Sequence, residues 1–206
     1  ALVIGFISLR SVTGEHFAIM TLGFSEVIRF VMLNEGWLTR GSLGLMGVPR
    51  PFSSVMWGLP YLLLLAAITL LIYFISERIR TSQLGRVLRG IRADSTAIEA
   101  LGKKVFHFKL VIFTVGASFG GIAGALYAHY VGAFQPSQFT PALTFIVAAS
   151  VIVGGEGNNR GIMLGSLIVV GVLYQGPRYL PKIGRAWTIP AIRYILIGIL
   201  IILVLR

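Results

Sequence analysis

The chain has 206 residues, of which 56% are hydrophobic and only 12% are charged, and its mean hydropathy is +0.86. A soluble domain carries about a quarter charged residues, so this composition excludes an ordinary soluble domain. The net charge of +11 is not gathered on one soluble face, which argues against a nucleic-acid partner, and the absence of Cys excludes a disulfide framework and a thiolate metal site.

Two long runs without Asp, Glu, Lys or Arg decide the fold class. They cover residues 51–76 and 110–155. Because about 20 apolar residues cross a bilayer core, the first run holds one crossing and the second has room for two. The sequence therefore predicts an all-α fold, a polytopic transmembrane helical bundle.

About six to seven membrane crossings are expected in this chain. In chain order they cover 1 to about 9, 13 to about 33, 57 to about 75, 109 to about 133, about 141 to 153, 161 to about 174 and about 189 to 205. The fifth and sixth are short for full crossings, so we expect them to be tilted, broken or partly re-entrant. The chain opens without Met or a positively charged leader, which predicts no signal peptide and a single domain over residues 1–206 that begins partway through a helix.

The basic residues are unevenly divided between the two sides of the membrane. Alternating crossings place Arg10, the loop at about 77–108, the 154–160 loop and Arg206 on one side, together with most of the 18 basic residues. Loops rich in Lys and Arg stay on the cytoplasmic side of a membrane. The 77–108 loop is therefore predicted to be cytoplasmic.

Glu26 and Arg29 place two charges inside the second crossing. They are three residues apart, so both side chains can lie on one helix face. Ionised groups at membrane depth are costly and face a protein interior, a partner or water. Two interpretations stay open: a paired structural charge, or a position near a transport pathway.

Small residues form two rows along the fourth crossing. The first row is Gly116, Gly120, Gly124 and Ala128, and the second is Ala117, Gly121 and Ala125. Small residues let another helix backbone approach closely. Packing within one subunit is the favoured interpretation, and a surface facing a partner subunit or a pathway is the alternative.

No motif in the sequence predicts catalysis. The glycine-rich loop at 154–161 lacks the Lys-Ser/Thr of a Walker loop and is interpreted as the tight turn of a membrane hairpin. His129 has no second His, Cys or carboxylate at ligand spacing, which favours a polar residue near the membrane interface over a metal ligand. The chain is therefore predicted to be no enzyme and to hold neither a metal nor a cofactor.

A polar island at residues 85–104 interrupts the apolar sequence. A basic stripe recurs every third residue along its first part, at Arg86, Arg89 and Arg92. Asp94 or Thr96 can cap a second short helix, and Gly102 is placed to end it. We expect two short amphipathic helices at the cytoplasmic face. Their role stays open between a loop resting on anionic lipid headgroups and a docking surface for a cytoplasmic partner.

The island also matches a known pattern, GR-x-L-R-A-I-R followed by A-x-x-A-L-G. The matching residues are Gly85, Arg86, Leu88, Arg89, Ile91 and Arg92, then Ala97, Ala100, Leu101 and Gly102. Gly90 stands where Ala is usual. Further stretches match in the same order at 14–31, 39–51, 120–140 and 151–166. In these segments the chain resembles the permease subunits of ABC-type importers for branched-chain amino acids.

The resemblance implies a permease subunit of an ATP-driven importer in a bacterial cytoplasmic (inner) membrane, without its N-terminal crossings. The partners that it implies are a second related permease, cytoplasmic ATP-binding subunits, an extracytoplasmic solute-binding protein and the lipid bilayer. The expected ATPase-coupling residues are Arg86, Arg89, Arg92, Ala97, Glu99, Ala100, Leu101 and Gly102. Glu26 and Arg29 are expected near the pathway, and Gly116, Gly120, Gly121 and Gly124 in helix packing.

Two other functions compete with the importer. An ion-coupled secondary transporter would use Glu26 as a proton or cation site and need no ATPase. A non-transporting membrane scaffold would use the island as a lipid-surface anchor. The substrate also stays open: leucine, isoleucine and valine are the family default, and urea, amides and other small solutes are the alternatives.

Overall fold

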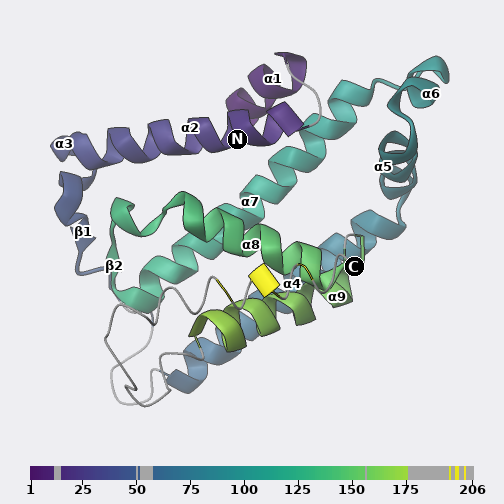
Figure 1. Ribbon diagram of the computed structural model, residues 1–206. Helices are drawn as coiled ribbons and strands as arrows, with labels where there is room; N and C mark the ends of the chain where they lie inside the picture. Colours follow the sequence, from purple (N-terminus) through teal and green to yellow (C-terminus); the bar gives the residue numbers. More distant parts are fainter. Residues whose placement is uncertain are drawn as a thin grey trace. The chain divides into compact units, whose positions relative to one another are not determined.

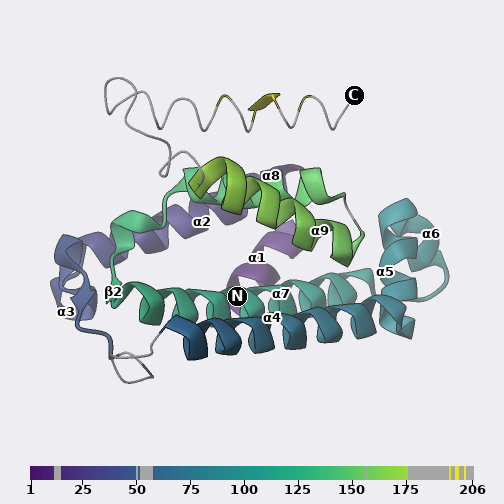
Figure 2. The same ribbon diagram turned by 90° about the horizontal axis from the view of Figure 1, so that it is seen from below.

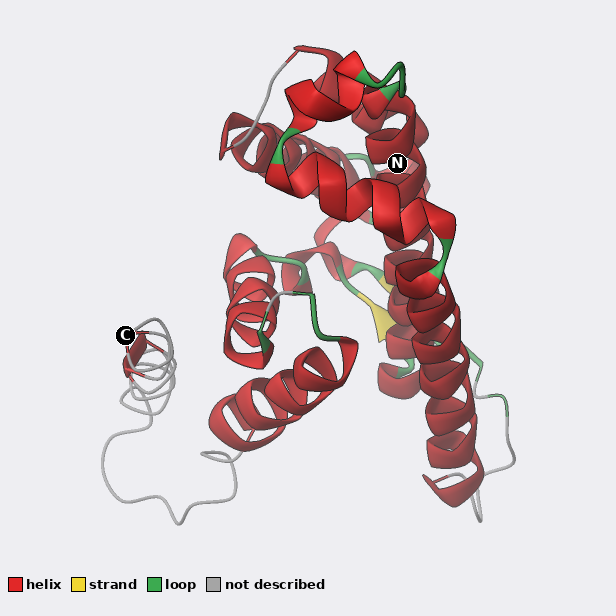
Figure 3. Ribbon diagram, turned by 90° about the vertical axis from the view of Figure 1, so that its right-hand side faces the viewer, coloured by secondary structure: helices red, strands yellow, loops and turns green. Residues whose placement is uncertain are grey.

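The computed structural model describes residues 1–11, 15–49, 51, 58–155, 157–175, 195, 198–199 and 202. The chain divides into two compact units, Ala1–Phe139 and Thr140–Arg206. Figure 1 draws the helices and strands of both units, coloured along the sequence. Helices dominate the described residues, in which the strands are one pair of two residues each, drawn in yellow in Figure 3. The predicted all-α membrane fold is confirmed, and the single domain over residues 1–206 stays a prediction.

The first unit is built on helices joined by short elements. Its main helices are α1 (Leu2–Ser11), α2 (Glu15–Asn34), α4 (Gly58–Thr81) and α7 (Val105–Val131). Between them lie α3 (Gly36–Thr39), the 3-10 helix η1 (Gly41–Leu43), β1 (Leu45–Met46), α5 (Gln83–Ala93) and α6 (Ser95–Ala100). The unit continues after α7 with β2 (Ala133–Phe134) and the 3-10 helix η2 (Pro136–Gln138). The second unit contains α8 (Pro141–Gly154), α9 (Asn159–Ser166) and the π-helix η3 (Leu167–Gln175).

Three helices in the described part are long and apolar enough to cross a membrane. They are His16–Asn34, Gly58–Thr81 and Val105–Val131, which coincide with the expected second, third and fourth crossings. Large apolar side chains are exposed along them, as at Phe74, so lipid is the solvent that these helices fit. The chain is therefore a multi-pass membrane protein. The fifth and sixth crossings correspond to α8 and to α9 with η3, and the seventh falls mostly outside the described residues.

Aromatic contacts attach α1 and the start of α2 to α7. The Phe6 and Phe106 rings meet edge to face with centroids 5.6 Å apart, and Phe17 meets Phe113 in the same way at 5.5 Å. Such pairs add to the dispersion contacts that hold helices together where no hydrophobic effect acts between them. The aromatic residues of the first half of α7 therefore bind the N-terminal helices.

Tyr61 joins the first turn of α4 to the last turns of α7, and the two helices lie side by side (Figure 2). The Tyr61 ring is 2% exposed and stacks on Tyr130 with centroids 6.2 Å apart. Its hydroxyl donates to the carbonyl of Leu126 at 2.5 Å. One side chain thus supplies both packing and a hydrogen bond at this end of the helix pair.

A strand clip ties the segment after α2 to the end of α7. In this antiparallel pair Leu45 faces Phe134 and Met46 faces Ala133. His129 reinforces the clip, because its Nδ1 lies 3.0 Å from the carbonyl oxygen of Pro49 and donates to it. Gly44 has φ of +72°, and a Cβ there would collide with the carbonyl oxygen of Phe134. The glycine therefore permits the close approach of the two segments.

The second unit contains a hairpin in which α8 and α9 meet backbone to backbone. A Cβ on Gly165 would lie 2.6 Å from both the Gly154 nitrogen and the Ser150 carbonyl oxygen. A Cβ on Gly161 would collide with the carbonyl oxygen of Gly154. Asn158 caps α9 by accepting the amide hydrogen of Arg160 at 3.2 Å. The predicted tight hairpin is confirmed, and its glycines pack the helices as well as turn the chain.

Candidate coupling segment

The two short helices predicted in the polar island are present as α5 and α6. They lie at the C-terminal end of α4 and the N-terminal end of α7 (Figure 2). The loop is shorter than the expected 77–108, because α4 continues to Thr81 and α7 begins at Val105. We refer to residues 82–104 below as the coupling segment, after the role that the sequence predicts for them. Glu77 and Arg80 form an ion pair on one face of α4, which adds a small stabilisation to the helix beyond its apolar sequence.

Gly85 allows α5 to turn sharply away from α4. It is buried, and a Cβ on it would collide with the carbonyl oxygen of Arg80 and lie 2.5 Å from that of Ile79. Ser82 caps α5, since its hydroxyl accepts the amide hydrogen of Gly85 at 3.4 Å. Any side chain at position 85 would push the two helices apart. The glycine of the Gly-Arg pair is thus a steric requirement of the bend between α4 and α5.

The three arginines of the basic stripe are exposed but do not have the same surroundings. Arg89 folds back, and its Nη1 donates to the carbonyl oxygen of Arg80 at 2.8 Å. This bond satisfies one of the carbonyls left unpaired at the end of α4. The opposite side of α5 carries Ile91, which is buried, as is Val105 at the start of α7. Arg89 therefore helps to position α5, while Arg86 and Arg92 lie on its exposed face.

Asp94 is the residue that caps α6. Its carboxylate accepts the amide hydrogens of Thr96 at 2.8 Å and Ala97 at 3.2 Å, and Thr96 lies inside the helix. Of the two caps that the sequence left open, the structure has Asp94. A carboxylate at this end also meets the positive end of the helix dipole.

Gly102 ends α6 with the geometry expected of a C′ glycine. Its φ is +74°, its amide donates to Glu99 at 2.9 Å, and the amide of Lys103 donates to Ile98 at 3.3 Å. These two bonds form a Schellman motif, in which a left-handed residue satisfies the last carbonyls of the helix. The predicted helix end is confirmed. It sends the chain directly into α7.

The outer face of α6 has no cover within the described chain. Leu101 is 73% exposed, and Ala97, Glu99 and Ala100 are exposed as well. Ile98 instead turns toward α5, where its Cδ1 would lie 2.7 Å from a Cβ on Gly90. The missing methyl at position 90, where Ala is usual, thus leaves room for Ile98. A large exposed leucine beside two alanines forms an apolar knob near the C-terminal end of this basic segment.

Glu26 and Arg29 meet on α2 as their spacing predicts. The Arg29 Nη2 lies 2.7 Å from Glu26 Oε2 and its Nε donates to the same oxygen at 2.9 Å. The guanidinium also lies 4.9 Å from the centroid of the Phe30 ring. The Glu26 side chain is 24% exposed and the Arg29 side chain is 19% exposed. The pair satisfies both charges locally, and a role in the pathway stays a prediction.

The glycines of α7 do not contact another described segment. A Cβ built on any of them would have no atom within 4 Å, which holds for Gly116, Gly120, Gly121 and Gly124. The favoured interpretation, packing within one subunit, therefore finds no neighbour among the described residues. A partner-facing surface stays a prediction. In the same part of the chain no group of three His, Cys, Asp or Glu residues could hold a metal ion.

Comparison with known proteins then decides the family. The family model described as "Branched-chain amino acid transport system / permease component" matches residues 1–205. The chain belongs to this family. No solved structure matches it significantly.

Curated members of the permease family cover most of the chain. The "High-affinity branched-chain amino acid transport system permease protein LivM" of Escherichia coli K12 is 33% identical over 194 residues, covering 82% of this chain and 45% of that protein. The "Probable branched-chain amino acid transport permease protein LivM" of Methanocaldococcus jannaschii is 34% identical over 145 residues, covering 67% and 41%. The corresponding LivH of E. coli K12 is 26% identical over 156 residues, covering 75% and 47%. The chain thus spans less than half the length of these relatives.

In this permease chain, two positioning contacts could not be predicted from the sequence, although the residues that make them were noted there. The bond from Arg89 to Arg80 depends on how α5 bends away from α4, which no spacing predicts. The contact of Gly161 with Gly154 depends on two helices together. A signal for the second was present, because Ser150 and Gly154 on α8, like Gly161 and Gly165 on α9, form a small-residue pair four positions apart.

Proposed function

We propose that this chain is part of a transmembrane permease subunit of an ATP-driven importer for branched-chain amino acids. The observation that carries the proposal is the coupling segment: two capped helices, fixed at the ends of two membrane helices, with an uncovered apolar knob at Leu101. A surface that is already ordered before it binds loses little entropy on docking. The family and the names of its members supply the substrate class.

The coupling segment can transmit a movement of a cytoplasmic partner to two membrane helices. α5 is joined to α4 through the Gly85 bend and the Arg89 bond to Arg80. α6 is joined to α7 through Gly102, with only a two-residue linker at 103–104. Both junctions are short and hydrogen-bonded, so movement of α6 is transmitted as a rigid-body movement of helix ends. A partner that binds one orientation better than the other shifts the conformational equilibrium.

Each coupling residue then has a distinct role. Ala97, Ala100 and Leu101 enter an apolar groove on the ATP-binding subunit. Arg86, Arg92 and Glu99 make polar contacts around it. Arg89 and Gly102 position the helices, so their substitution acts through the geometry of the segment rather than through a lost contact.

The remaining partners follow from the same model of the assembly. A second, related permease completes the pathway, and the uncovered glycine face of α7 is one surface available to it. A solute-binding protein delivers the amino acid on the side opposite the coupling segment. ATP is hydrolysed in separate subunits, so this chain is not an enzyme. The coupling segment lies in the cytoplasm and the permease in the cytoplasmic membrane, as the distribution of Lys and Arg indicates.

ATP-dependent leucine uptake tests the proposal. Proteoliposomes would hold the full-length permease, its companion subunits and the binding protein, with Leu101→Asp as the variant. We expect association of the ATP-binding subunit to weaken by about tenfold or more, because a charge replaces the centre of an apolar contact. Uptake should fall with it.

Gln83→Asp is the matched control for this variant. Gln83 is exposed on the first turn of α5, so it receives the same added charge in the same segment away from the knob. Its uptake and association should equal those of the wild type. If Leu101→Asp inserts normally and keeps both, the coupling segment is no docking surface, and the lipid-anchored scaffold gains support.

The same liposomes separate the importer from an ion-coupled transporter. Glu26 already forms an ion pair with Arg29 at 2.7 Å, so a transported cation would have to compete with the guanidinium for that carboxylate. We expect uptake to persist when ionophores abolish the ion gradients while ATP remains. Collapse of uptake under those conditions, together with its loss in Glu26→Gln, would identify the ion-coupled mechanism instead.

A further inference from the structure

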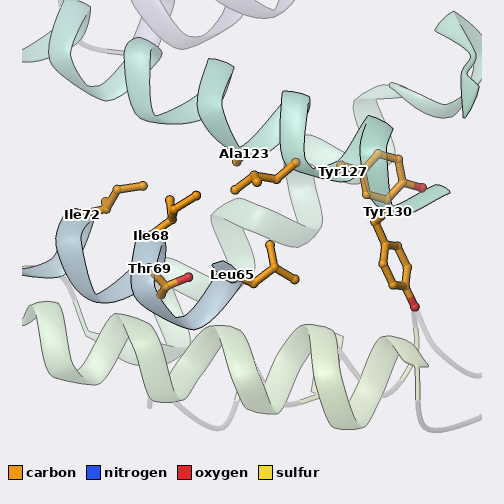
Figure 4. A pocket seen from close by; sticks show the side chains of 8 residues that line it. Leu65, Ile68, Thr69, Ile72, Ala123, Tyr127 and Tyr130 are labelled. Carbon is orange, nitrogen blue, oxygen red and sulfur yellow. The ribbon is translucent and has the colours of Figure 1, made fainter. Parts of the chain in front are cut away.

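A second feature of the first unit is an apolar groove between α4 and α7, which differs in chemistry from the coupling segment. α4 contributes Leu65, Ile68, Thr69 and Ile72, and α7 contributes Ala123 and three larger side chains (Figure 4). Its volume is about 350 Å³. We propose that this groove is a binding site for one acyl chain of a membrane phospholipid. The binding of the acyl chain does not depend on the proposed transport function, whereas its effect on the coupling segment rests on that proposal.

The depth of the groove makes lipid its natural occupant. Every lining residue belongs to one of two candidate membrane spans, Gly58–Thr81 or Val105–Val131. Among the lining residues there is no charged side chain, and Thr69 is the single polar residue between the aliphatic ones. A groove lined in this way offers apolar contacts and few hydrogen-bond partners for water. At this depth in a bilayer the apolar ligand present in excess is a fatty acyl chain.

One end of the groove has the chemistry of the membrane interface. Tyr127 and Tyr130 lie there, on the last turns of α7, and Figure 4 shows their rings beyond the aliphatic row. Tyrosine at the membrane boundary presents an apolar ring to the hydrocarbon and a hydroxyl to the headgroups. The groove therefore offers apolar walls for the chain and hydroxyls near its ester end.

The shape of the groove is held open by a contact already described. Tyr61 stacks on Tyr130 and donates to the carbonyl of Leu126, so α4 and α7 are fastened together at this end. The side chains of Leu65 and Leu126 line the groove about one helical turn from the Tyr61–Tyr130 contact. The cavity is thus a built feature of the helix pair, with a fixed spacing at its interfacial end.

The size and the lining of the groove favour an acyl chain over a neighbouring helix. An α-helix with its side chains is about 10–12 Å across, so a helix could only place side chains in this groove, whereas an acyl chain can enter it along its length. A methylene group is about as large as a water molecule, with a volume of about 30 Å³, so the groove holds roughly a dozen of them. That is most of one acyl chain. Large side chains line the groove, whereas helix contacts in membranes favour small ones.

An acyl chain in this place would act on the helices that carry the coupling segment. α4 leads into α5, and α6 leads into α7, so the two walls of the groove continue into the two ends of that segment. The bound chain contacts both walls on the side of the groove that leads to the coupling segment, away from the end that Tyr61 fixes. The site therefore offers a route by which the acyl composition of the membrane adjusts the position of α5 and α6.

Photo-crosslinking tests the site directly. The full-length permease with its companion subunits would be placed in nanodiscs that contain phosphatidylcholine with a diazirine in the middle of one acyl chain. After illumination, mass spectrometry would locate the labelled residues. We expect Ile68 and Ala123 to be labelled about fivefold more than Ile122, which is exposed on another side of α7, because a bound chain resides in the groove longer than a passing one.

Filling the groove provides the second measurement. Ala123→Trp occupies the cavity and should reduce the labelling of Ile68 about fivefold, and the smaller Ala123→Leu should reduce it less. Leu71→Trp is the control, since Leu71 is exposed on α4 and does not line the groove. Equal labelling of the groove and Ile122 would show ordinary boundary lipid and overturn the proposal. Absence of labelling would show that protein covers the groove, and would overturn it as well.

Discussion

The chain contains two glycine-rich regions that use glycine in opposite ways. In the α8–α9 hairpin, Gly154, Gly161 and Gly165 bring two backbones so close that no Cβ fits between them. On α7, Gly116 and Gly120 have open space where a Cβ would stand. The sequence signals are alike, with small residues four positions apart in both. The comparison shows that this spacing marks a helix surface that can pack closely against another backbone. It does not show whether the other backbone belongs to the same chain.

Gly161→Val is expected to have the largest effect. The side chain would collide with the carbonyl oxygen of Gly154, and the hairpin would have to open along its whole length. We expect the second unit to lose about 3 kcal/mol of stability, the upper part of the range for overpacked interiors. Unfolding in a series of detergent–SDS mixtures would measure it.

Gly121→Val serves as the reference for that variant. It places the same side chain on a helix glycine that has no neighbour within 4 Å. Its stability should stay within about 0.5 kcal/mol of the wild type. Equal losses in the two variants would mean that both regions are packed alike, and the contrast between the hairpin and α7 would disappear.

Gly85→Ala extends the comparison to the coupling segment, with a smaller effect. The methyl group would meet backbone carbonyls of Ile79 and Arg80 that cannot move independently of α4. We expect α5 to detach locally at a cost of about 2 kcal/mol, which is roughly 30-fold faster trypsin cleavage after Arg86.

Gly90→Ala is the control that separates a steric clash at position 85 from a general effect of replacing glycine by alanine in α5. Its added methyl would meet only the movable end of the Ile98 side chain, at 2.7 Å. Alanine also favours the helix, so cleavage should stay near the wild-type rate. Rapid cleavage in this variant too would show that the bend at Gly85 is not the sensitive point.

Gly120→Ala is expected to have the smallest effect on the subunit by itself. With no contact at this position, the helix preference of alanine should leave stability unchanged or raise it by up to about 1 kcal/mol. The sharper result concerns assembly: if a second permease packs on this face, co-purification of that subunit should decrease. Destabilisation of the isolated subunit would instead show that a segment of the same chain covers α7.

The membrane helices were predictable because hydropathy and charge act locally. The crossing expected at 57 to about 75 is α4, which begins at Gly58. Its end at Thr81 was missed, since the helix continues through a charged stretch that the Glu77–Arg80 ion pair makes compatible with a helix. The cap at Asp94 and the end at Gly102 were predictable for the same reason, because capping involves residues only a few positions apart.

What the sequence did not reveal depends on contacts between separate elements. The bend at Gly85 and the bond from Arg89 to Arg80 depend on the angle between α4 and α5. The spacing of the residues along the sequence does not determine that angle. The groove needs α4 and α7 side by side, so Ile68 and Ala123 had no visible connection in the sequence. Residues whose roles are set by one helix were therefore identified, and those set by two were not.

The strand clip also has a consequence for the order of events during biosynthesis. Met46 pairs with Ala133, so the clip joins positions that lie far apart along the chain. At elongation rates of about 5–20 residues per second, the ribosome needs roughly 5–20 s to make the intervening segment. During that interval the segment after α2 has no strand partner, while α4, α5, α6 and α7 are synthesised. The clip therefore closes late, and its closure marks the completion of the first unit in the membrane.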